Sequence, residues 1–264
     1  MKKYLVIGNP ITHSLSPELH NHWIKQNGLN AIYDKKKLND DELEKLILDV
    51  KEGNIHGVNV TVPFKNAIIP YLDELSGEAK ITQAVNTIYL RDKKIVGHNT
   101  DTEGFENAIK KINFDFNNKK IFILGAGGVV PSIIHASIKM GASEILISNR
   151  TKEKAEMIKN IFHNIKLFEW GEVPSFDVII NATSIGLNQE DKLNLDLTKV
   201  GKNKLFYDVI YNPSETYFLN TGKKLGNKYE NGKLMFVFQA FLSFKLWHGI
   251  LPKIDNETMR LLNK

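Results

Sequence analysis

The chain has 264 residues, enough for two modest domains or one large one, and 42% of them are hydrophobic and 25% charged. These proportions are ordinary for a folded globular protein, so they exclude a disordered chain and a fibrous repeat. The formal net charge is +5, but the lysines occur as scattered pairs and triplets with Asp and Glu between them, which indicates solvated faces rather than a nucleic-acid groove.

Membrane, disulfide and metal functions are also disfavoured. No apolar run reaches the roughly 18 residues of a membrane-spanning helix, and the start MKKYLVIGNP breaks before a signal-peptide apolar region develops. The chain has no cysteine, which excludes disulfides and thiolate metal sites and fits a reducing compartment. His20 and His22 are two positions apart and face different ways on a helix. We expect a cytoplasmic protein without metal, membrane or nucleic-acid partners.

The first half of the chain alternates strand and helix patterns. The predicted elements are strands at 4–7 and 57–62 and helices beginning at Pro17, at Asp40 and at Lys65. Short apolar runs at 88–90 and 94–96 predict a hairpin, and Asp101 is a candidate cap for a helix that runs to about residue 112. This half contains no phosphate-type glycine loop, so it predicts an α/β domain of its own.

The second half has the pattern of a βαβ unit. The apolar run 119–124 leads directly into Gly125-Ala126-Gly127-Gly128, a helix follows over 129–140, and the next strand is predicted at 144–148. Further strands at 176–181 and 205–210 continue the alternation, which predicts a doubly wound, Rossmann-like parallel sheet. The apolar stretch 234–251 has the length of a helix, and we expect it to return to the first domain.

The glycine turn and the end of the strand at 144–148 point to a nucleotide cofactor. Glycines allow backbone N–H groups to approach a pyrophosphate at a helix N-terminus, although Val130 stands where a third glycine is usual. NAD enzymes usually place a carboxylate after the second strand, but this chain has Arg150 there, and its guanidinium suits a ribose 2′-phosphate. The sequence therefore favours NADP over NAD.

Two groups of polar residues in the first half are unusual in their placement. Ser14 and Ser16 lie at the start of a predicted helix, where an ordinary N-cap is the simplest interpretation of Ser16. In the predicted strand 57–62, Asn59 and Thr61 share one face that leads to Lys65. A solvent-facing strand would explain that pattern as well.

Together these segments resemble the shikimate dehydrogenase family, in order along nearly the whole chain. The segments are Ser14-Leu15-Ser16-Pro17 with His20-Asn21, Asn59 to Lys65, Ala84-Val85-Asn86-Thr87, Asn99-Thr100-Asp101, Asn181 to Ser184 with Gly186, Asp208 with Tyr211-Asn212-Pro213, Asn231-Gly232, Met235, Gln239 and Leu246 to Gly249. Three places depart from the family pattern: Gln83 and Leu234 replace glycines, and residues 129–131 replace smaller residues.

The resemblance implies a role for each matching position. Ser14, Ser16 and Tyr211 would hold the substrate carboxylate, and Asn59, Thr61, Asn86 and Gln239 would surround the ring hydroxyls. Lys65 and Asp101 would stand at the reacting carbon–oxygen group, with Lys65 as general acid/base and Asp101 as its orienting partner. The cofactor side would comprise Gly125, Ala126, Gly127, Gly128, Val129, Asn149, Arg150, Thr151, Lys154, Thr183, Val209, Gly232 and Met235.

The expected protein is thus an NADP-dependent enzyme that interconverts 3-dehydroshikimate and shikimate in aromatic amino acid biosynthesis, as a monomer or homodimer. We expect a substrate-binding catalytic domain at 1–103, an NADP-binding domain at 104–232 and a returning helical segment at 233–264. Two alternatives stay open: a relative that accepts quinate or NAD, and a catalytically silent sensor that binds shikimate or nucleotide.

Overall fold

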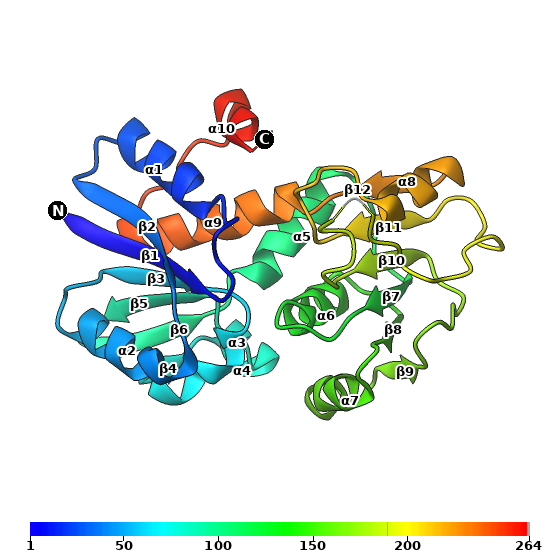
Figure 1. Cartoon of the computed structure of the whole chain (residues 1–264), viewed down its shortest axis with the longest axis horizontal. Coiled ribbons are helices and arrows are strands. Elements are labelled where there is room, and N and C mark those ends of the chain that lie inside the picture. The colour runs from blue at the N-terminus through cyan, green and yellow to red at the C-terminus, as the bar shows by residue number, and fades with distance from the viewer. Residues whose placement is uncertain (189, 263–264) are drawn as a thin grey trace. The chain divides into compact units, whose positions relative to one another are not determined.

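The computed structural model describes residues 1–188 and 190–262 (Figure 1). The chain divides into two compact units: unit 1 comprises Met1–Gly104 and the described residues from Val237 onward, and unit 2 comprises Phe105–Phe236. The boundaries fall inside helices α5 (Asp101–Lys111) and α9 (Lys233–His248). No helix in the described ranges is both long and apolar enough to span a bilayer.

Unit 1 contains a mixed sheet with the strand order β2-β1-β3-β5-β6-β4. Its strands are β1 (Lys2–Gly8), β2 (Ala31–Lys37), β3 (Gly57–Val60), β4 (Glu74–Leu75), β5 (Thr87–Arg91) and β6 (Lys94–His98). β1 runs parallel to β2 and β3, whereas β5 is antiparallel to β3 and β6. β5 and β6 are the predicted hairpin, and Asp92 and Lys93 turn the chain with positive φ angles.

Helices cover the sheet of unit 1 on both faces. They are α1 (Ser16–Gln26), α2 (Leu43–Lys51), the one-turn α3 (Phe64–Ala67), α4 (Gly77–Thr82), α10 (Asn256–Leu261) and parts of α5 and α9, with 3-10 turns at Asp40–Glu42 and Ile69–Tyr71. Leu43, Leu46, Ile47 and Val50 form the apolar stripe of α2 and pack into the same core as Val58. On the other face, Trp247 of α9 donates its indole N–H to the carbonyl of Ile88 at 3.0 Å.

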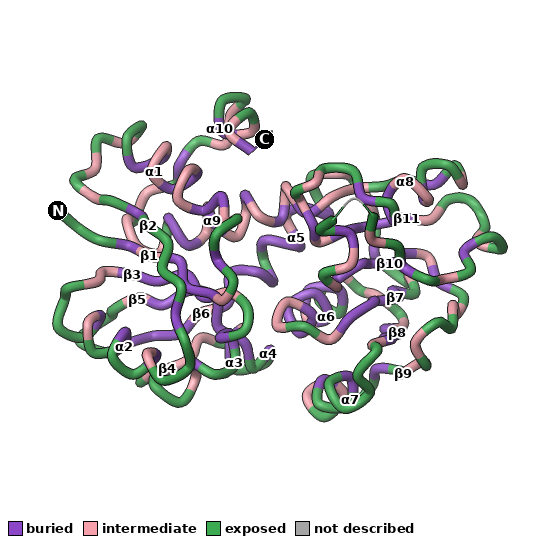
Figure 2. The backbone as a smooth tube through the Cα atoms, in the orientation of Figure 1, coloured by how far each residue is buried: buried purple, intermediate pink, exposed green. Residues whose placement is uncertain are grey.

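Unit 2 contains a parallel sheet with the order β12-β11-β10-β7-β8-β9. Its strands are β7 (Lys120–Leu124), β8 (Glu144–Ser148), β9 (Lys166–Phe168), β10 (Val178–Asn181), β11 (Leu205–Asp208) and β12 (Lys228–Glu230), and its helices include α6 (Val130–Lys139), α7 (Lys152–Ile161) and α8 (Tyr217–Lys224). The central strands β10 and β11 are buried throughout, and β7 is buried from Ile121 to Leu124 (Figure 2). The strand order reverses at β7, where sheets of this kind bind ligands at the carboxyl ends of their strands. The predicted doubly wound parallel sheet is confirmed.

Three local predictions are wrong: the end of the strand at 57–62, the N-cap role of Ser16 and the cap role of Asp101. β3 ends at Val60, not at residue 62, because Pro63 has no N–H for a ladder and the chain turns at Thr61, whose carbonyl accepts the N–H of Phe64. Thr61 therefore does not continue the face of Asn59 within a strand. Ser16 is the first residue of α1 rather than its N-cap, a position that Leu15 occupies.

Asp101 does not cap α5. The side-chain oxygen of Asn99 accepts the N–H of Thr102 at 3.1 Å and takes that role, which leaves the carboxylate of Asp101 free to bond elsewhere. Residues 31–37 form strand β2, which no pattern predicts, because it lies at the sheet edge and exposes most of its side chains, including the lysine triplet 35–37. Exposed lysines are a common protection for edge strands.

Candidate functional site

Lys65 and Asp101 form a buried ion pair in unit 1. Nζ of Lys65 lies 2.5 Å from Oδ2 of Asp101, and the two residues are 7% and 5% exposed. Lys65 comes from the one-turn helix α3 that follows β3, and Asp101 from the first turn of α5 that follows β6. Burial of two charges is costly unless they are paired and further hydrogen-bonded. The pair therefore needs the polar groups that surround it.

Asn86 supplies that support. Its amide nitrogen donates to Oδ1 of Asp101 and to the hydroxyl of Thr100, both at 2.9 Å. Its amide oxygen accepts the N–H of Thr100 at 2.8 Å and the hydroxyl of Thr87 at 3.1 Å. Both ends of the amide are satisfied, which fixes the orientation of the Asp101 carboxylate.

Asn59 extends the same network toward α9 and β2. Its amide nitrogen donates to the carbonyl of Asn86 at 3.1 Å, to the hydroxyl of Thr87 at 3.1 Å and to the hydroxyl of Ser243 at 3.0 Å. Its amide oxygen accepts the hydroxyl of Tyr33 at 2.7 Å. Tyr33, Thr87 and Ser243 were not among the predicted site residues. Ser243 could have been noticed as a polar residue inside the apolar stretch 234–251.

The two serines lie at the start of α1. Ser16 is buried, and its N–H donates to the Ser14 hydroxyl at 3.3 Å. Leu15, the residue at the N-cap, provides no side-chain hydrogen bond to the helix. The first N–H groups of α1 therefore lie beside two hydroxyls, which is an arrangement suited to an anion.

The structure places Thr61, Gln239 and Tyr211 less directly. Thr61 follows β3, and its methyl group fills the space beside Gly8, where an added Cβ would approach it to 2.6 Å. Gln239 lies on α9, where Gly104 of α5 permits close contact: a Cβ there would be 2.9 Å from the Gln239 nitrogen. Tyr211 belongs to unit 2, where its ring stacks on Phe236 at 4.6 Å.

In unit 2, the glycine turn after β7 has the geometry of a phosphate cradle. Gly125 has a φ of +114°, and a Cβ there would lie 2.7 Å from the carbonyl of Ala182. At Gly127 the nearest atom to an added Cβ is 4.0 Å away, which leaves room for a ligand to reach the backbone. Val129 caps α6 without a side-chain hydrogen bond, and Pro131 stands in the first turn as predicted. These residues fit a dinucleotide pyrophosphate.

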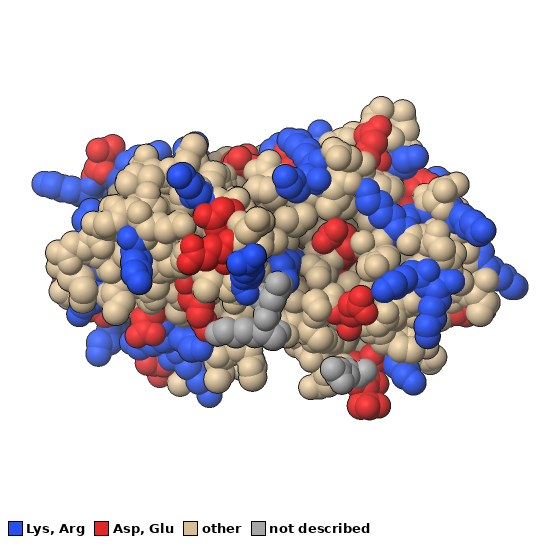
Figure 3. Space-filling model, turned by 90° about the horizontal axis from the view of Figure 1, so that it is seen from above, with Lys and Arg blue, Asp and Glu red and all other residues tan. Residues whose placement is uncertain are grey.

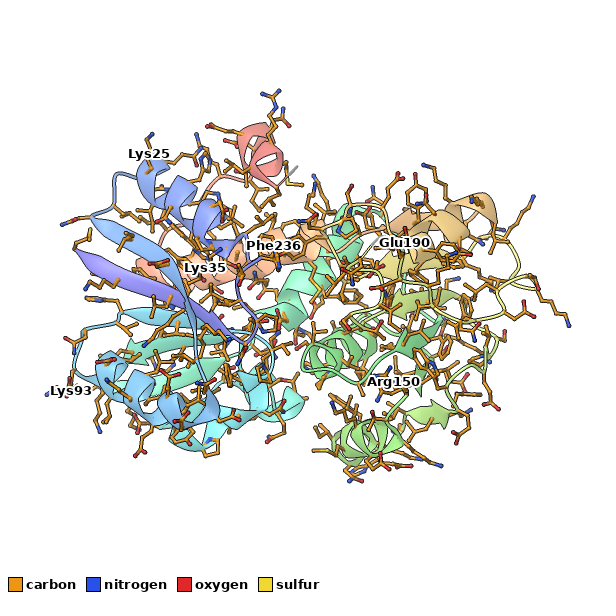
Figure 4. All side chains as sticks on the ribbon, in the orientation of Figure 1. Lys25, Lys35, Lys93, Arg150, Glu190 and Phe236 are labelled. Carbon is orange, nitrogen blue, oxygen red and sulfur yellow. The ribbon has the colours of Figure 1, made fainter. Side chains whose placement is uncertain are left out.

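The predicted 2′-phosphate region follows β8. Arg150 is exposed, and within the described part of the chain its guanidinium has no hydrogen bond or ion pair (Figure 4). The Asn149 amide nitrogen donates to the carbonyl of Thr151 at 2.6 Å, which shapes the loop before α7. Lys154 is an exposed cation in the first turn of α7. An uncommitted guanidinium at this strand end suits a phosphate ester.

The loops after β10 and β11 are tied together by Asp208. Its carboxylate accepts the Thr216 hydroxyl at 2.7 Å, the Ile210 N–H at 3.0 Å and the Asn181 amide at 3.1 Å. Burial is the largest influence on this carboxyl and raises the pKa of Asp208 to about 6, against the opposing effect of those hydrogen bonds. Asn181 also accepts the Thr183 hydroxyl at 2.7 Å. Asp208 therefore fixes the loops that carry Thr183 and Val209.

Gly232 and Met235 complete the predicted cofactor residues. The N–H of Gly232 donates to the carbonyl of Ile210 at 3.1 Å, and a Cβ on Gly232 would collide with the Val209 carbonyl. Met235 is buried in the first turn of α9. Gly232 thus lies against the loop that follows β11.

Metal ligands and charged surfaces add little to this arrangement. Among the described residues, no group of three or more His, Asp or Glu side chains could hold a metal ion. On the face drawn in Figure 3, Lys and Arg are scattered with Asp and Glu among them.

Comparisons with known proteins agree with this geometry. Residues 6–88 match the family model described as the shikimate dehydrogenase substrate binding domain, and residues 106–209 match the one described as shikimate / quinate 5-dehydrogenase. The NADP(+) shikimate dehydrogenase of Pelagibacter ubique is 55% identical over 262 residues, which are 99% of each chain. The chain belongs to the shikimate dehydrogenase family.

Solved structures of this family share the fold. The shikimate dehydrogenase of Aquifex aeolicus superposes with a TM-score of 0.90 at 36% identity, covering 100% of this chain and 98% of its own. The shikimate 5-dehydrogenase of Listeria monocytogenes, solved with shikimate and NAD, has a TM-score of 0.90 at 29% identity and covers 99% and 96%. Members of the shikimate dehydrogenase family thus share both the sequence segments and the architecture of this chain.

Proposed function

We propose that this chain is an NADP-dependent shikimate dehydrogenase that reversibly reduces 3-dehydroshikimate to shikimate, a step of chorismate and aromatic amino acid biosynthesis. The observation that carries the proposal is the buried Lys65–Asp101 pair, held by Asn86, in a chain of this family. The 55% identity to the NADP(+) shikimate dehydrogenase of Pelagibacter ubique supports both the reaction and the cofactor.

Unit 1 is proposed to bind the substrate. Ser14 and Ser16 offer hydroxyls at the positive end of the α1 dipole, which suits the carboxylate, and Tyr211 of unit 2 is proposed to bind it too. Asn59, Thr61, Asn86 and Gln239 are proposed to contact the ring hydroxyls. Amide groups both donate and accept hydrogen bonds, so they can bind hydroxyl groups without carrying a net charge.

Lys65 is proposed to be the general acid/base. When the ring carbonyl is reduced, its oxygen gains negative charge and must take up a proton, which the Nζ of Lys65 can deliver. In the oxidation direction the same amine accepts the proton of the hydroxyl. Asp101 keeps Nζ in place through the 2.5 Å contact, while Asn86 holds the carboxylate from its other oxygen.

Unit 2 is proposed to bind NADP, which supplies or accepts the hydride when bound. Residues 125–129 would cradle the pyrophosphate, because Gly127 leaves the backbone open at the start of α6. Arg150 would pair with the 2′-phosphate, with Asn149, Thr151 and Lys154 beside it. Thr183, Val209, Gly232 and Met235 would line the rest of the cofactor site, on loops that Asp208 fixes.

We further propose that the protein works in the cytoplasm, as a monomer or homodimer, with residues 1–103 as the substrate domain, 104–232 as the NADP domain and 233–264 as a segment of the first. The absence of cysteine and the ordinary mixed-charge surface support a cytoplasmic location.

Steady-state assays separate this function from its alternatives. Oxidation of shikimate and of quinate should be measured with NADP and with NAD, using the purified full chain. We expect kcat/KM to be highest for shikimate with NADP. Comparable values for quinate or NAD would indicate the broader dehydrogenase, a possibility kept open by the quinate in one family description. Binding of shikimate or nucleotide without turnover would indicate the silent sensor and overturn the proposal.

A further inference from the structure

The proposed substrate carries a carboxylate, but the residues proposed to bind it carry no net positive charge. Ser14, Ser16 and Tyr211 are neutral. The positive charge of Lys65 is balanced by Asp101, whose carboxylate lies 2.5 Å from it. The start of α1 contributes only the partial charge of a helix end. A cation close to the two serines would therefore strengthen the binding of the anion.

Lys35 of β2 is a cation at this place, because it contacts the loop that joins β1 to α1 (Figure 4). Its Nζ donates to the carbonyl of Thr12 at 2.6 Å. Thr12 lies inside a turn that is closed by a hydrogen bond of 3.1 Å from the N–H of Ser14 to the carbonyl of Ile11. The ends of such a turn are less than about 7 Å apart. The ammonium of Lys35 thus contacts the same turn that presents Ser14.

The register of the sheet places Lys35 on the face that carries the site. Val6 of β1 pairs with Lys35 on one side and with Asn59 on the other, so the three side chains lie on one face. Tyr33, two positions before Lys35, shares this face, and its hydroxyl donates to Asn59. Helix α1 covers the same face, since the ring of His20 stacks on Tyr33. Lys35 therefore lies on the side of the sheet where the two serines begin α1.

The charge of Lys35 is available to a ligand. An ammonium has three N–H donors, and the carbonyl of Thr12 takes one of them. Within the described ranges, Lys35 forms no ion pair. Asp34, the adjacent carboxylate, accepts the backbone N–H of Lys35 at 2.7 Å and belongs to the opposite face of the strand. Because Lys35 is exposed, water and salt screen its charge, so its effect on an anion is moderate.

We propose that Lys35 supplies the positive charge that offsets the substrate carboxylate at Ser14 and Ser16, with its ammonium held beside them by the carbonyl of Thr12. The inference rests on the proposed function, which assigns the carboxylate to these serines. Lys35 acts through its charge and not at the reacting carbon. It therefore changes how tightly the anion binds, while the rate of the chemical step depends on Lys65.

The central test is Lys35→Met, which keeps most of the side-chain length and removes the charge. At low ionic strength we expect the shikimate KM to rise about three- to fivefold, as for the loss of an exposed charge pair. The kcat and the NADP KM should stay within about twofold. Lys35→Arg keeps the charge and should keep the shikimate KM within about twofold of the wild type.

Lys36→Met is the matched control. Lys36 is the next residue of the same strand, is also exposed, and belongs to the opposite face because it pairs with Ile7. The substitution changes the net charge of the chain by the same amount. If the charge of Lys35 acts locally, the shikimate KM of Lys36→Met should stay within about 1.5-fold of the wild type.

Salt and an uncharged analogue separate the charge of Lys35 from an effect on the shape of the loop. At about 1 M salt the screening length falls to about 3 Å, so the difference in shikimate KM between wild type and Lys35→Met should nearly vanish. Inhibition of 3-dehydroshikimate reduction by shikimate and by its methyl ester gives the second comparison. Lys35→Met should raise the inhibition constant of shikimate about three- to fivefold and leave that of the ester unchanged.

Three results overturn the proposal. They are a wild-type shikimate KM for Lys35→Met at low salt, an equal rise for Lys36→Met, and equal losses for shikimate and its methyl ester. Each of them leaves the proposed function intact as long as the wild-type chain oxidises shikimate. A wild-type chain that does not oxidise shikimate overturns both proposals.

Discussion

Nζ of Lys65 lies 2.5 Å from the carboxylate of Asp101, although 36 positions separate the two residues in the chain. The two strand ends from which they come are held together by Asn86, which bonds Asp101 and precedes β5. The Lys65 side chain, which would be mobile if it were exposed, is held in one position by this contact. Such confinement is what a proton-transfer group requires.

Replacing Lys65 with Ala should lower turnover by about 10² to 10⁴, the usual contribution of general acid–base catalysis. It should also cost stability, about 3–5 kcal/mol, because Asp101 is left buried without its cation. Steady-state kinetics and urea unfolding measure the two effects, and NADP binding should persist. Lys94→Ala is the control, since Lys94 pairs with Glu74 at the surface of the same unit. Near-native turnover of Lys65→Ala would rule out the acid/base role.

Arg150→Ala and Arg150→Asp should raise the NADP KM at least tenfold, because a charge-assisted pair is worth roughly 1.5–3 kcal/mol. Activity with NAD should barely change, since NAD has no 2′-phosphate. Kinetics with both cofactors measure the difference, with Arg91→Ala as the control because Arg91 pairs with Glu74 in unit 1. Equal losses with NADP and NAD would show that Arg150 acts on the structure of the loop instead.

Asp208→Asn should change how stability depends on pH. Burial raises the pKa of Asp208 from 3.8 to about 6, so between these values the folded state holds more protons than the unfolded state. Its contribution to stability is present below pH ~4 and is lost as pH rises through ~6, by about 3 kcal/mol in total. The Asn variant lacks this loss. Its free energy of unfolding, measured with urea, should therefore rise relative to that of the wild type from pH ~4 to ~7. A constant difference between the two proteins would contradict the shift.

His20→Phe should act in the opposite direction. Burial, with a smaller effect of His248, lowers the pKa of His20 from 6.5 to about 3, so the folded state binds fewer protons than the unfolded state in this range. Its contribution is present above pH ~6.5 and is lost as pH falls toward ~3. Between pH ~7 and ~4.5 the wild type should lose about 2–3 kcal/mol more than the variant. If the free energies of unfolding of the two proteins fall equally as the pH is lowered, His20 does not contribute to the pH dependence of stability.

Gln83 occupies a left-handed backbone conformation with a φ of 49°, and it is one of the three places that depart from the family pattern. A side chain there costs about 1–2 kcal/mol, partly offset by the greater flexibility of unfolded glycine. We expect Gln83→Gly to stabilise the chain by about 0.5–1 kcal/mol and Gln83→Ala to give no gain. Thermal unfolding of the two variants checks this order, and a more stable Ala variant would contradict it.

Local patterns predicted much of the fold, and the resemblance to the family supplied the candidate site residues. The βαβ unit around Gly125 could be predicted from contiguous residues, because strand, turn and helix preferences act over a few positions. Strand β2 was missed because its stability comes from pairing at a sheet edge, while its own lysines give no apolar alternation. Asp101 was misread as a helix cap because an aspartate before a helix has that role by local preference, and only the fold shows Asn99 in its place.

The sequence by itself determined the residue types of the site: two serines, two asparagines, a lysine and an aspartate in motifs of this family. Only the tertiary structure decided which of them touch. Asn59 reaches Ser243 across 184 positions and Tyr33 across 26, and neither contact follows from the residues that surround the partner in the sequence. A hydrogen bond depends on separations of about 3 Å and on direction, and such distances between remote segments are set by the packing of the sheet and α9, not by the composition of either segment.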